Sequence, residues 1–121
     1  MSFRDARTHL QDILESIAMI DLFVKEMDFQ DYRDDLKTKS AVERQLQIIT
    51  EAAYRLGDEA NAVCPGPNWK GLMGMGNILR HGYHRVDDEI VWDTVKSDLP
   101  LLRQAVEAGL ADPSSAMTGQ G

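Results

Sequence analysis

The sequence contains a single cysteine, Cys64, and no long uninterrupted run of apolar residues. One thiol cannot form an internal disulfide or a zinc site built from several thiolates, and such sparse cysteine use is typical of a reducing cytoplasm. No segment reaches the roughly 20 apolar residues that a membrane-spanning helix needs. The first ten residues hold two arginines, an aspartate and no apolar run, unlike a secretion signal. We therefore expect a cytoplasmic protein that does not enter the membrane.

Positive charge is also scarce, because 13 Lys+Arg stand against 20 Asp+Glu and the formal net charge is −7. This balance argues against nucleic-acid binding through bulk positive charge, although it leaves room for a local basic pocket. The 121 residues, 43% of them hydrophobic, suit one globular domain. We expect that domain over residues 1–110 and a flexible tail over residues 111–121, which contain no leucine, isoleucine, valine or aromatic residue.

Apolar residues that recur at alternating spacings of three and four predict two long amphipathic helices. The first helix is expected from about Phe3 to Asp28, with the stripe Leu10, Ile13, Ile17, Ile20, Val24 and Met27. The polar stretch 29–39 is interpreted as a loop or a short helical lead-in, held by Tyr32 and Leu36. The second helix is expected from Ser40, or already from Asp31, with the stripe Val42, Leu46, Ile49, Ala53 and Leu56.

Proline, glycine and capping residues predict the remaining boundaries. The run CPGP at 64–67 ends regular structure, and Asn68 is placed to cap a third helix that Gly82 terminates after His81. Asp87 is placed to cap a fourth helix, in which residues 90–95 are expected to be helical rather than a strand. Pro100 is expected to interrupt that helix and to lie in the first turn of a last short one.

These elements predict an all-α, up-down bundle of four or five helices in which the two long helices form an antiparallel pair. No hairpin signal or internal repeat competes with this architecture. The two long apolar stripes also suit a helical homodimer.

Chemically active side chains are concentrated at positions 80–85, which read RHGYHR. His81 beside Arg80 suits RNA cleavage by the RNA's own 2′-hydroxyl, since an imidazole moves a proton near neutral pH and a guanidinium stabilises charge on the phosphate. The structural alternative is a histidine that merely interacts with carbonyls at a helix end. Asn77 lies one turn before His81 and is placed to orient the imidazole or to contact a ligand.

Other interpretations of the same segment are weaker. Tyr83 is either a half-buried aromatic or a hydroxyl open to covalent modification. A metal site would need His81 and His84 together with Asp87 or Asp88, but Gly82 breaks the helix between the two histidines, so no metal is expected. The glycines at 71, 74 and 76 suit close helix packing better than a phosphate-binding loop. Glu51 is expected on the second helix, either facing this site or simply solvated.

The run GMGNILRHGYHRVDDEIVWDTVKSDLPLL, Gly74 to Leu102, resembles the C-terminal signature of HepT-like proteins in the HEPN superfamily. The stretch AVERQLQIITEAAYRL, Ala41 to Leu56, is similar to the second long helix of that family. The resemblance covers about residues 5–110. It implies an all-α HEPN-like domain that dimerises, with the active cleft between two subunits. It also implies a metal-independent endoribonuclease toxin of a type VII toxin–antitoxin system, acting on RNA without a cofactor and paired with an MntA-like nucleotidyltransferase antitoxin.

The resemblance also assigns roles to individual residues. The family pattern has an arginine a few positions before His-x-Tyr, so His81 corresponds to the catalytic histidine and Tyr83 to the tyrosine that the antitoxin adenylylates. Asn77 matches the polar residue that follows the arginine. This sequence departs from the pattern because Gly76 stands where the arginine belongs, and Arg80, one helical turn further on, is the candidate substitute. The alternative is a catalytically impaired, non-enzymatic subunit that docks the nucleotidyltransferase and serves as its substrate.

Overall fold

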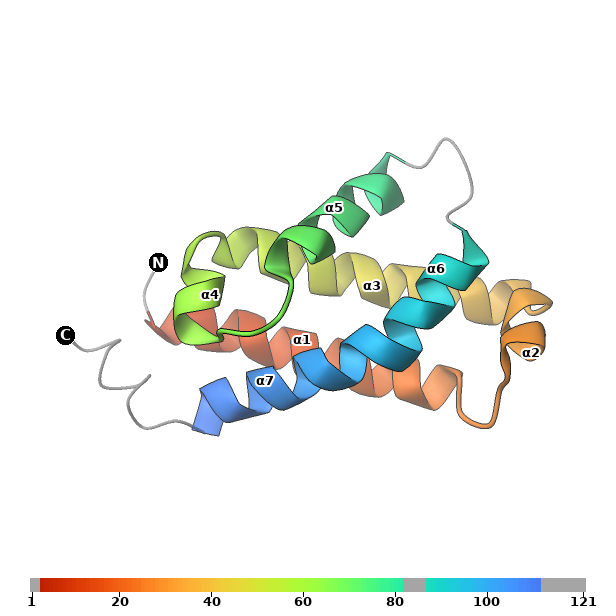
Figure 1. The fold of residues 1–121 in the computed structure, drawn as a ribbon, viewed down its shortest axis with the longest axis horizontal. Helices are drawn as coiled ribbons and strands as arrows, with labels where there is room; N and C mark the ends of the chain where they lie inside the picture. The colour runs from red at the N-terminus through yellow and green to blue at the C-terminus, as the bar shows by residue number, and fades with distance from the viewer. Residues whose placement is uncertain (1–2, 82–86, 112–121) are drawn as a thin grey trace.

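The computed structural model describes residues 3–81 and 87–111. Its helices are α1 (Phe3–Phe23), α2 (Phe29–Arg33), α3 (Leu36–Leu56), α4 (Glu59–Val63), α5 (Trp69–Arg80), α6 (Asp88–Asp93), a π-helical turn η1 (Thr94–Asp98) and α7 (Leu99–Ala111). The long segments alternate in direction, and α1 and α3 form an antiparallel pair (Figure 1). The predicted all-α up-down bundle is confirmed, with α2 and α4 as additional short helices. The expected tail beyond Ala111 lies outside the described residues.

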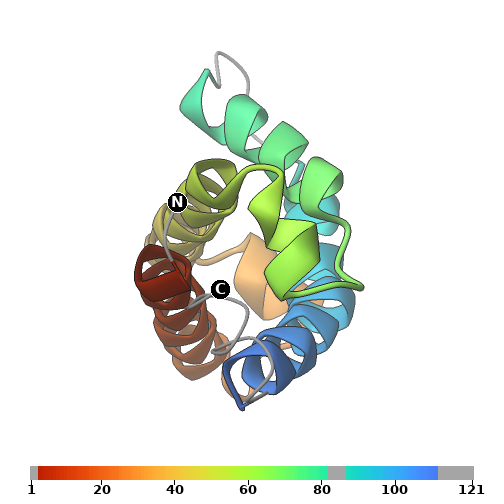
Figure 2. The same ribbon diagram turned by 90° about the vertical axis from the view of Figure 1, so that its left-hand side faces the viewer.

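The core lies between α1, α3 and the rod formed by α6, η1 and α7. Seen along the bundle, α5 stands on the α3 side of this core (Figure 2). Both predicted apolar stripes supply it, and their fully or almost fully buried members include Leu10, Ile13, Ile17, Ile20, Val42, Leu46, Ile49 and Leu56. Arg103 of α7 pairs with Asp21 of α1 at 3.3 Å, and Arg7 donates to the Leu110 carbonyl at 3.1 Å. These contacts hold α7 along the length of α1.

The first helix ends earlier than its apolar stripe predicts. Helix α1 ends at Phe23, and Glu26 adopts a left-handed conformation with φ of 66°. Asp28 then begins α2 through a capping box, because its carboxylate accepts from the Asp31 backbone and the Asp31 carboxylate accepts in return. Val24 is buried although it lies beyond the end of the helix. The apolar spacing therefore extends past the helix into the following turn, which is why it predicted too late an end.

The stretch 29–39 holds the short helix α2 and the beginning of α3. Tyr32 is fully buried, as predicted, whereas Leu36 is 68% exposed and anchors nothing. Helix α3 is capped by Asp35, which accepts from the Thr38 backbone at 3.0 Å, rather than by Ser40. Helices α2 and α3 are thus each capped by a separate aspartate, whose carboxylate accepts a hydrogen bond from a backbone N–H of the first turn.

Pro100 does not interrupt the last helix. The chain runs from Asp88 to Ala111 as one rod, and Pro100 lies in the first turn of α7. A proline lacks an N–H and crowds the carbonyl four residues earlier. The π-helical turn η1 precedes it, and the Leu99 N–H reaches the Thr94 carbonyl. The predicted caps are confirmed, since Asn68 accepts from Gly71 at 3.0 Å and Asp87 from Glu89 at 2.8 Å.

Helix α5 is fixed to α3 by a close crossing at Gly76. A Cβ atom placed on Gly76 would lie 2.7 Å from both the Cβ and the Oγ1 of Thr50, so only glycine fits at this distance. The Gln47 side chain donates to the Leu79 carbonyl at 3.3 Å, one turn further along the same interface. These contacts set how far the C-terminal end of α5 stands from α3.

We predict that Gly76→Ala lowers the free energy of unfolding by about 1–3 kcal/mol, because the added methyl group overlaps a well-packed side chain. Gly74→Ala is the matched control on the same helix, since its Cβ would meet nothing within 4 Å. Better helix propensity should leave that control unchanged or more stable by up to about 1 kcal/mol. Urea unfolding followed by circular dichroism measures both changes, and equal effects would contradict the close crossing.

Burial also sets the ionisation of the single thiol in the sequence. Cys64 is fully buried, and burial raises the pKa of its thiol to about 11. The neutral thiol is therefore favoured in the folded chain. The neutral thiol contributes to the stability of the fold, fully so below the unfolded thiol pKa of about 8.5. This contribution to stability is lost as the pH rises towards the folded pKa of about 11.

We predict that Cys64 reacts with a disulfide reagent at about pH 8 at least tenfold more slowly in the folded chain than in denaturant, because both burial and the scarcity of thiolate slow attack. The release of the chromophoric thiol measures the rate. Equal rates in native and denatured protein would contradict the burial of this side chain.

Candidate active site

The C-terminal end of α5 presents a histidine to solvent. Helix α5 ends at Arg80, and the backbone N–H of His81 donates to the Asn77 carbonyl at 3.0 Å. The His81 side chain is exposed. The end of the helix therefore holds an exposed imidazole at a backbone position fixed by a hydrogen bond.

Arg80 is held by two neighbours. Its Nη2 donates to the Asn77 Oδ1 at 2.6 Å within the same helix, and its Cζ lies 5.8 Å from the centre of the Tyr54 ring on α3. A cation at this distance from an aromatic ring is attracted to the ring's negative face. The guanidinium has five N–H donors, and the bond to Asn77 uses one of them. Asn77 therefore orients Arg80 in this structure, and its expected role of orienting the imidazole or contacting a ligand stays a prediction.

A second guanidinium belongs to the same end of α5. Arg44 of α3 donates to the Gln47 side chain at 3.3 Å, and Gln47 in turn donates to the Leu79 carbonyl. Through Gln47, Arg44 is linked to the backbone of the last turn of α5, the helix that carries Arg80 and ends before His81. The end of α5 thus has one guanidinium on its own last turn and one linked to it through Gln47, on a chain whose formal net charge is −7.

Gly76 faces the protein interior and not the surface that carries His81. It is buried against Thr50, so an arginine at this position would have to displace α3 before it could reach solvent. Arg80 is exposed and on the same helix. In the described structure, Arg80 is thus the arginine of α5 that can meet a ligand beside His81.

Several predicted site residues are not brought together or are not described. Tyr83 and His84 lie outside the described residues. Asp87 caps α6, and Asp88 pairs with Lys39 of α3 at 3.3 Å, so both carboxylates have structural partners. Within residues 3–81 and 87–111, no three histidine, cysteine or acidic side chains group as a metal site. Glu51 is exposed on α3, one turn before Tyr54.

The Lys39–Asp88 pair was missed by the sequence analysis. The Lys39 side chain is only 7% exposed, and its pairing partner begins α6. Lys39 stands three positions before Val42, in line with the apolar stripe of α3. This position was the one signal in the sequence that Lys39 is buried. Asp88 is 49 positions away, so the pairing itself needed the tertiary structure. The pair holds α6 against α3 just after the segment that contains Tyr83.

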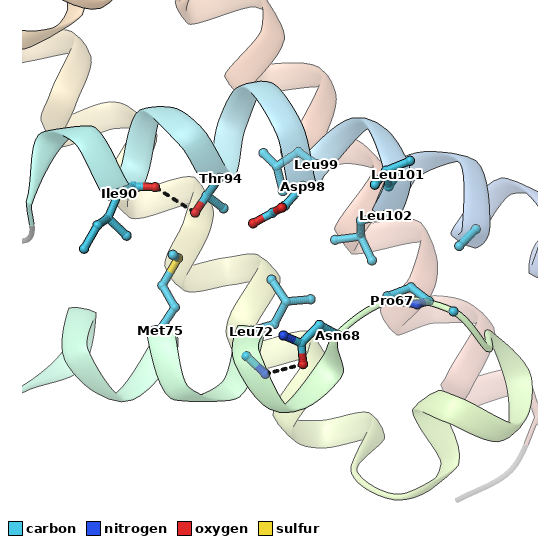
Figure 3. A pocket seen from close by; sticks show the side chains of 13 residues that line it. Pro67, Asn68, Leu72, Met75, Ile90, Thr94, Asp98, Leu99, Leu101 and Leu102 are labelled. Carbon is cyan, nitrogen blue, oxygen red and sulfur yellow. Dashed lines mark hydrogen bonds between the residues drawn. The ribbon is translucent and has the colours of Figure 1, made fainter.

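A separate apolar groove of about 670 Å³ lies between the first half of α5 and the rod of α6, η1 and α7. Figure 3 shows Leu72 and Met75 facing Leu102 and Ile90 across it, with Asp98 as its carboxylate. His81 and Arg80 do not line this groove. The groove therefore has the apolar character of a contact surface and lacks the polar groups of the α5 terminus.

Comparison with known proteins identifies the family. Residues 13–108 match the model of the ribonuclease HepT-like family. A Methanocaldococcus jannaschii protein named "Putative RNase" is 36% identical over 107 residues, which cover 88% of this chain and 98% of the relative. A Thermococcus cleftensis protein named "Probable ribonuclease HepT" is 36% identical over 104 residues, which cover 86% of this chain and 94% of the relative.

A bacterial relative extends the comparison. A protein of Caldanaerobacter subterraneus subsp. tengcongensis, also named "Putative RNase", is 32% identical over 101 residues, covering 84% of this chain and 90% of the relative. No solved structure gives a significant match. The chain belongs to the HepT-like ribonuclease family of the HEPN superfamily, as its C-terminal signature predicted.

In the ranges 3–81 and 87–111, no helix is both long enough and apolar enough to cross a bilayer.

Proposed function

We propose that this protein is a metal-independent endoribonuclease. The observation that carries the proposal is the exposed His81 at the end of α5, beside an Arg80 that Asn77 and Tyr54 hold in place. The ribonuclease names of the relatives support the same reaction class. In this reaction the RNA 2′-oxygen attacks the adjacent phosphorus and the P–O5′ bond breaks, which leaves a 2′,3′-cyclic phosphate and a 5′-hydroxyl.

The residues have separate roles in this reaction. His81 takes the proton from the 2′-hydroxyl or returns one to the leaving 5′-oxygen, which an imidazole does well near neutral pH. Arg80 stabilises the negative charge that develops on the phosphate oxygens. Asn77 fixes the guanidinium through the 2.6 Å hydrogen bond. Arg80 replaces the family arginine, because the position of Gly76 is closed by Thr50.

The proposal extends to a toxin of a type VII toxin–antitoxin system. The family resemblance supports a homodimer with its cleft between two subunits, and an MntA-like nucleotidyltransferase as antitoxin. In the neutralising step the Tyr83 hydroxyl oxygen attacks the α-phosphorus of ATP, pyrophosphate leaves, and the tyrosine carries AMP. The single buried Cys64 is compatible with the cytoplasm, where such a pair would act.

The second candidate function is a non-enzymatic subunit that docks the nucleotidyltransferase and is modified by it. The observation that favours it is Gly76, because the family arginine is absent and the crossing with Thr50 leaves no room to restore it. The two functions differ in RNA cleavage, whereas both require the modification of Tyr83.

We predict that the wild-type protein cleaves single-stranded RNA in the presence of EDTA and that His81→Ala lowers the rate by at least about 100-fold, the usual contribution of a positioned acid or base. Gel separation of labelled RNA, with mapping of the cyclic-phosphate ends, measures the reaction. His9→Ala, on the distant α1, is the matched control and should cleave at the wild-type rate.

Circular dichroism should show that His81→Ala keeps its fold, because the side chain is exposed. Equal cleavage by wild type and His81→Ala would remove His81 from the mechanism. Absence of cleavage by the folded wild-type protein would favour the docking subunit instead.

We predict that incubation with the cognate nucleotidyltransferase and ATP adds AMP to the wild-type protein and to Tyr54→Phe, but not to Tyr83→Phe. The phenol oxygen is the attacking nucleophile, and phenylalanine lacks it. Intact-protein mass spectrometry measures the added mass. A modification that persists in Tyr83→Phe would place the AMP on another residue.

A further inference from the structure

We infer that Tyr54 and Arg80 form a binding subsite for one unpaired RNA nucleotide, in which the Tyr54 ring stacks on the base and the Arg80 guanidinium binds the adjoining phosphate. The inference rests on the proposed function, since it assigns a substrate-binding residue to the same site. The Tyr54 position was not among the residues that the sequence pointed to, and its ring lies on α3 rather than on the helix that carries His81.

Tyr54 is unusual among the aromatic residues of the described chain. Its exposed fraction is 66%, whereas Tyr32 is fully buried and stacks with Trp92 at a centroid distance of 5.3 Å. Tyr54 contributes little to the core, and the contact of its ring is with the Arg80 guanidinium. An exposed ring beside a cation on the surface is the usual composition of a site for single-stranded nucleic acid.

The geometry of the crossing explains why the two side chains meet. Helices α3 and α5 run in opposite directions (Figure 1). Their close contact is between Thr50 and Gly76. Tyr54 stands one turn beyond Thr50, and Arg80 stands one turn beyond Gly76. Because helical side chains lean towards the N-terminus of their own helix, both lean back across the crossing and so towards each other.

Arg80 is prepared for a phosphate by this arrangement. The Asn77 amide oxygen and the Tyr54 ring restrict the guanidinium, and the single bond to Asn77 leaves other N–H groups to donate to phosphate oxygens. The described contacts thus join the Tyr54 ring to the Arg80 guanidinium, and His81 follows Arg80 in the chain. A nucleotide on Tyr54 would place its phosphate at Arg80, which directly precedes His81 in the chain.

A base is the occupant that fits this subsite. The ring offers a flat apolar surface, and stacking on it requires a base that is not already paired within a duplex. Stacking is tolerant of base identity, because every base has an aromatic face. The subsite therefore predicts a preference for single-stranded over double-stranded RNA, with little preference among sequences at this position.

The test is the binding of a short single-stranded oligoribonucleotide in which every 2′-hydroxyl is methylated, so that it cannot be cleaved through that oxygen. Fluorescence anisotropy of the labelled oligonucleotide gives the Kd. Tyr54→Leu removes the aromatic face and should raise the Kd by about tenfold, as the loss of one base–aromatic stack does. Tyr54→Phe keeps the face and should stay within about twofold of wild type.

Leu36→Ala is the matched control. Leu36 is on the same helix, is 68% exposed against 66% for Tyr54, and lies about 27 Å away along the helix axis at 1.5 Å per residue. It should bind like the wild type. Thermal unfolding of all variants shows that each is folded, and a duplex of the same sequence should bind the wild type more weakly than the single strand.

Each outcome separates the subsite from the nuclease reaction. Binding that depends on the Tyr54 ring, without any cleavage of ordinary RNA, would support the subsite and contradict the nuclease. Cleavage by the wild type, together with an unchanged Kd in Tyr54→Leu, would overturn the subsite and leave the nuclease. Failure of the wild type to bind the oligonucleotide, or equal binding of the duplex, would also overturn the subsite.

Discussion

The close contact between Gly76 and Thr50 is the constraint on which the candidate site depends. Most contacts of helix α5 are with α3, and at this crossing the Thr50 side chain lies so close to Gly76 that even a methyl group would overlap it. The same crossing brings the Tyr54 ring of α3 and the Arg80 guanidinium of α5 together. The restriction to glycine at position 76 and the placement of Arg80 therefore depend on one packing arrangement.

The ends of α5 and α6 are held by polar contacts with α3. Gln47 donates to the carbonyl of Leu79, and Lys39 pairs with Asp88 while almost fully buried. A buried ion pair is costly to break because removal of one partner leaves the other charge unpaired. Helix α3 thus positions both sides of the segment that contains Tyr83, while its own buried stripe ties these positions to the core.

The chain is acidic overall but has exposed basic side chains at the end of α5. Its formal net charge is −7, yet Arg80 and His81 are both exposed at the C-terminal end of α5, and Gln47 links Arg44 to the same turn. Such a surface would bind RNA through a few directed contacts and one stacked base rather than through a broad positive field. The apolar groove on the other side of α5 is chemically distinct, since its facing residues are mostly leucine, methionine and isoleucine.

The sequence by itself determined the helical class, the two long stripes, the caps at Asn68 and Asp87, and the family, because these depend on local spacing and on motifs. It misplaced the end of α1 and the effect of Pro100, because Val24 stays buried past the helix and a π-helical turn precedes the proline. It proposed His81, Arg80 and Asn77 as site residues, and these roles stay predictions; the structure adds that the Asn77 amide oxygen accepts from Arg80. Only the tertiary structure decided that Gly76 faces Thr50 and that Tyr54 meets Arg80, because both contacts join residues that are more than 20 positions apart and depend on how α5 crosses α3.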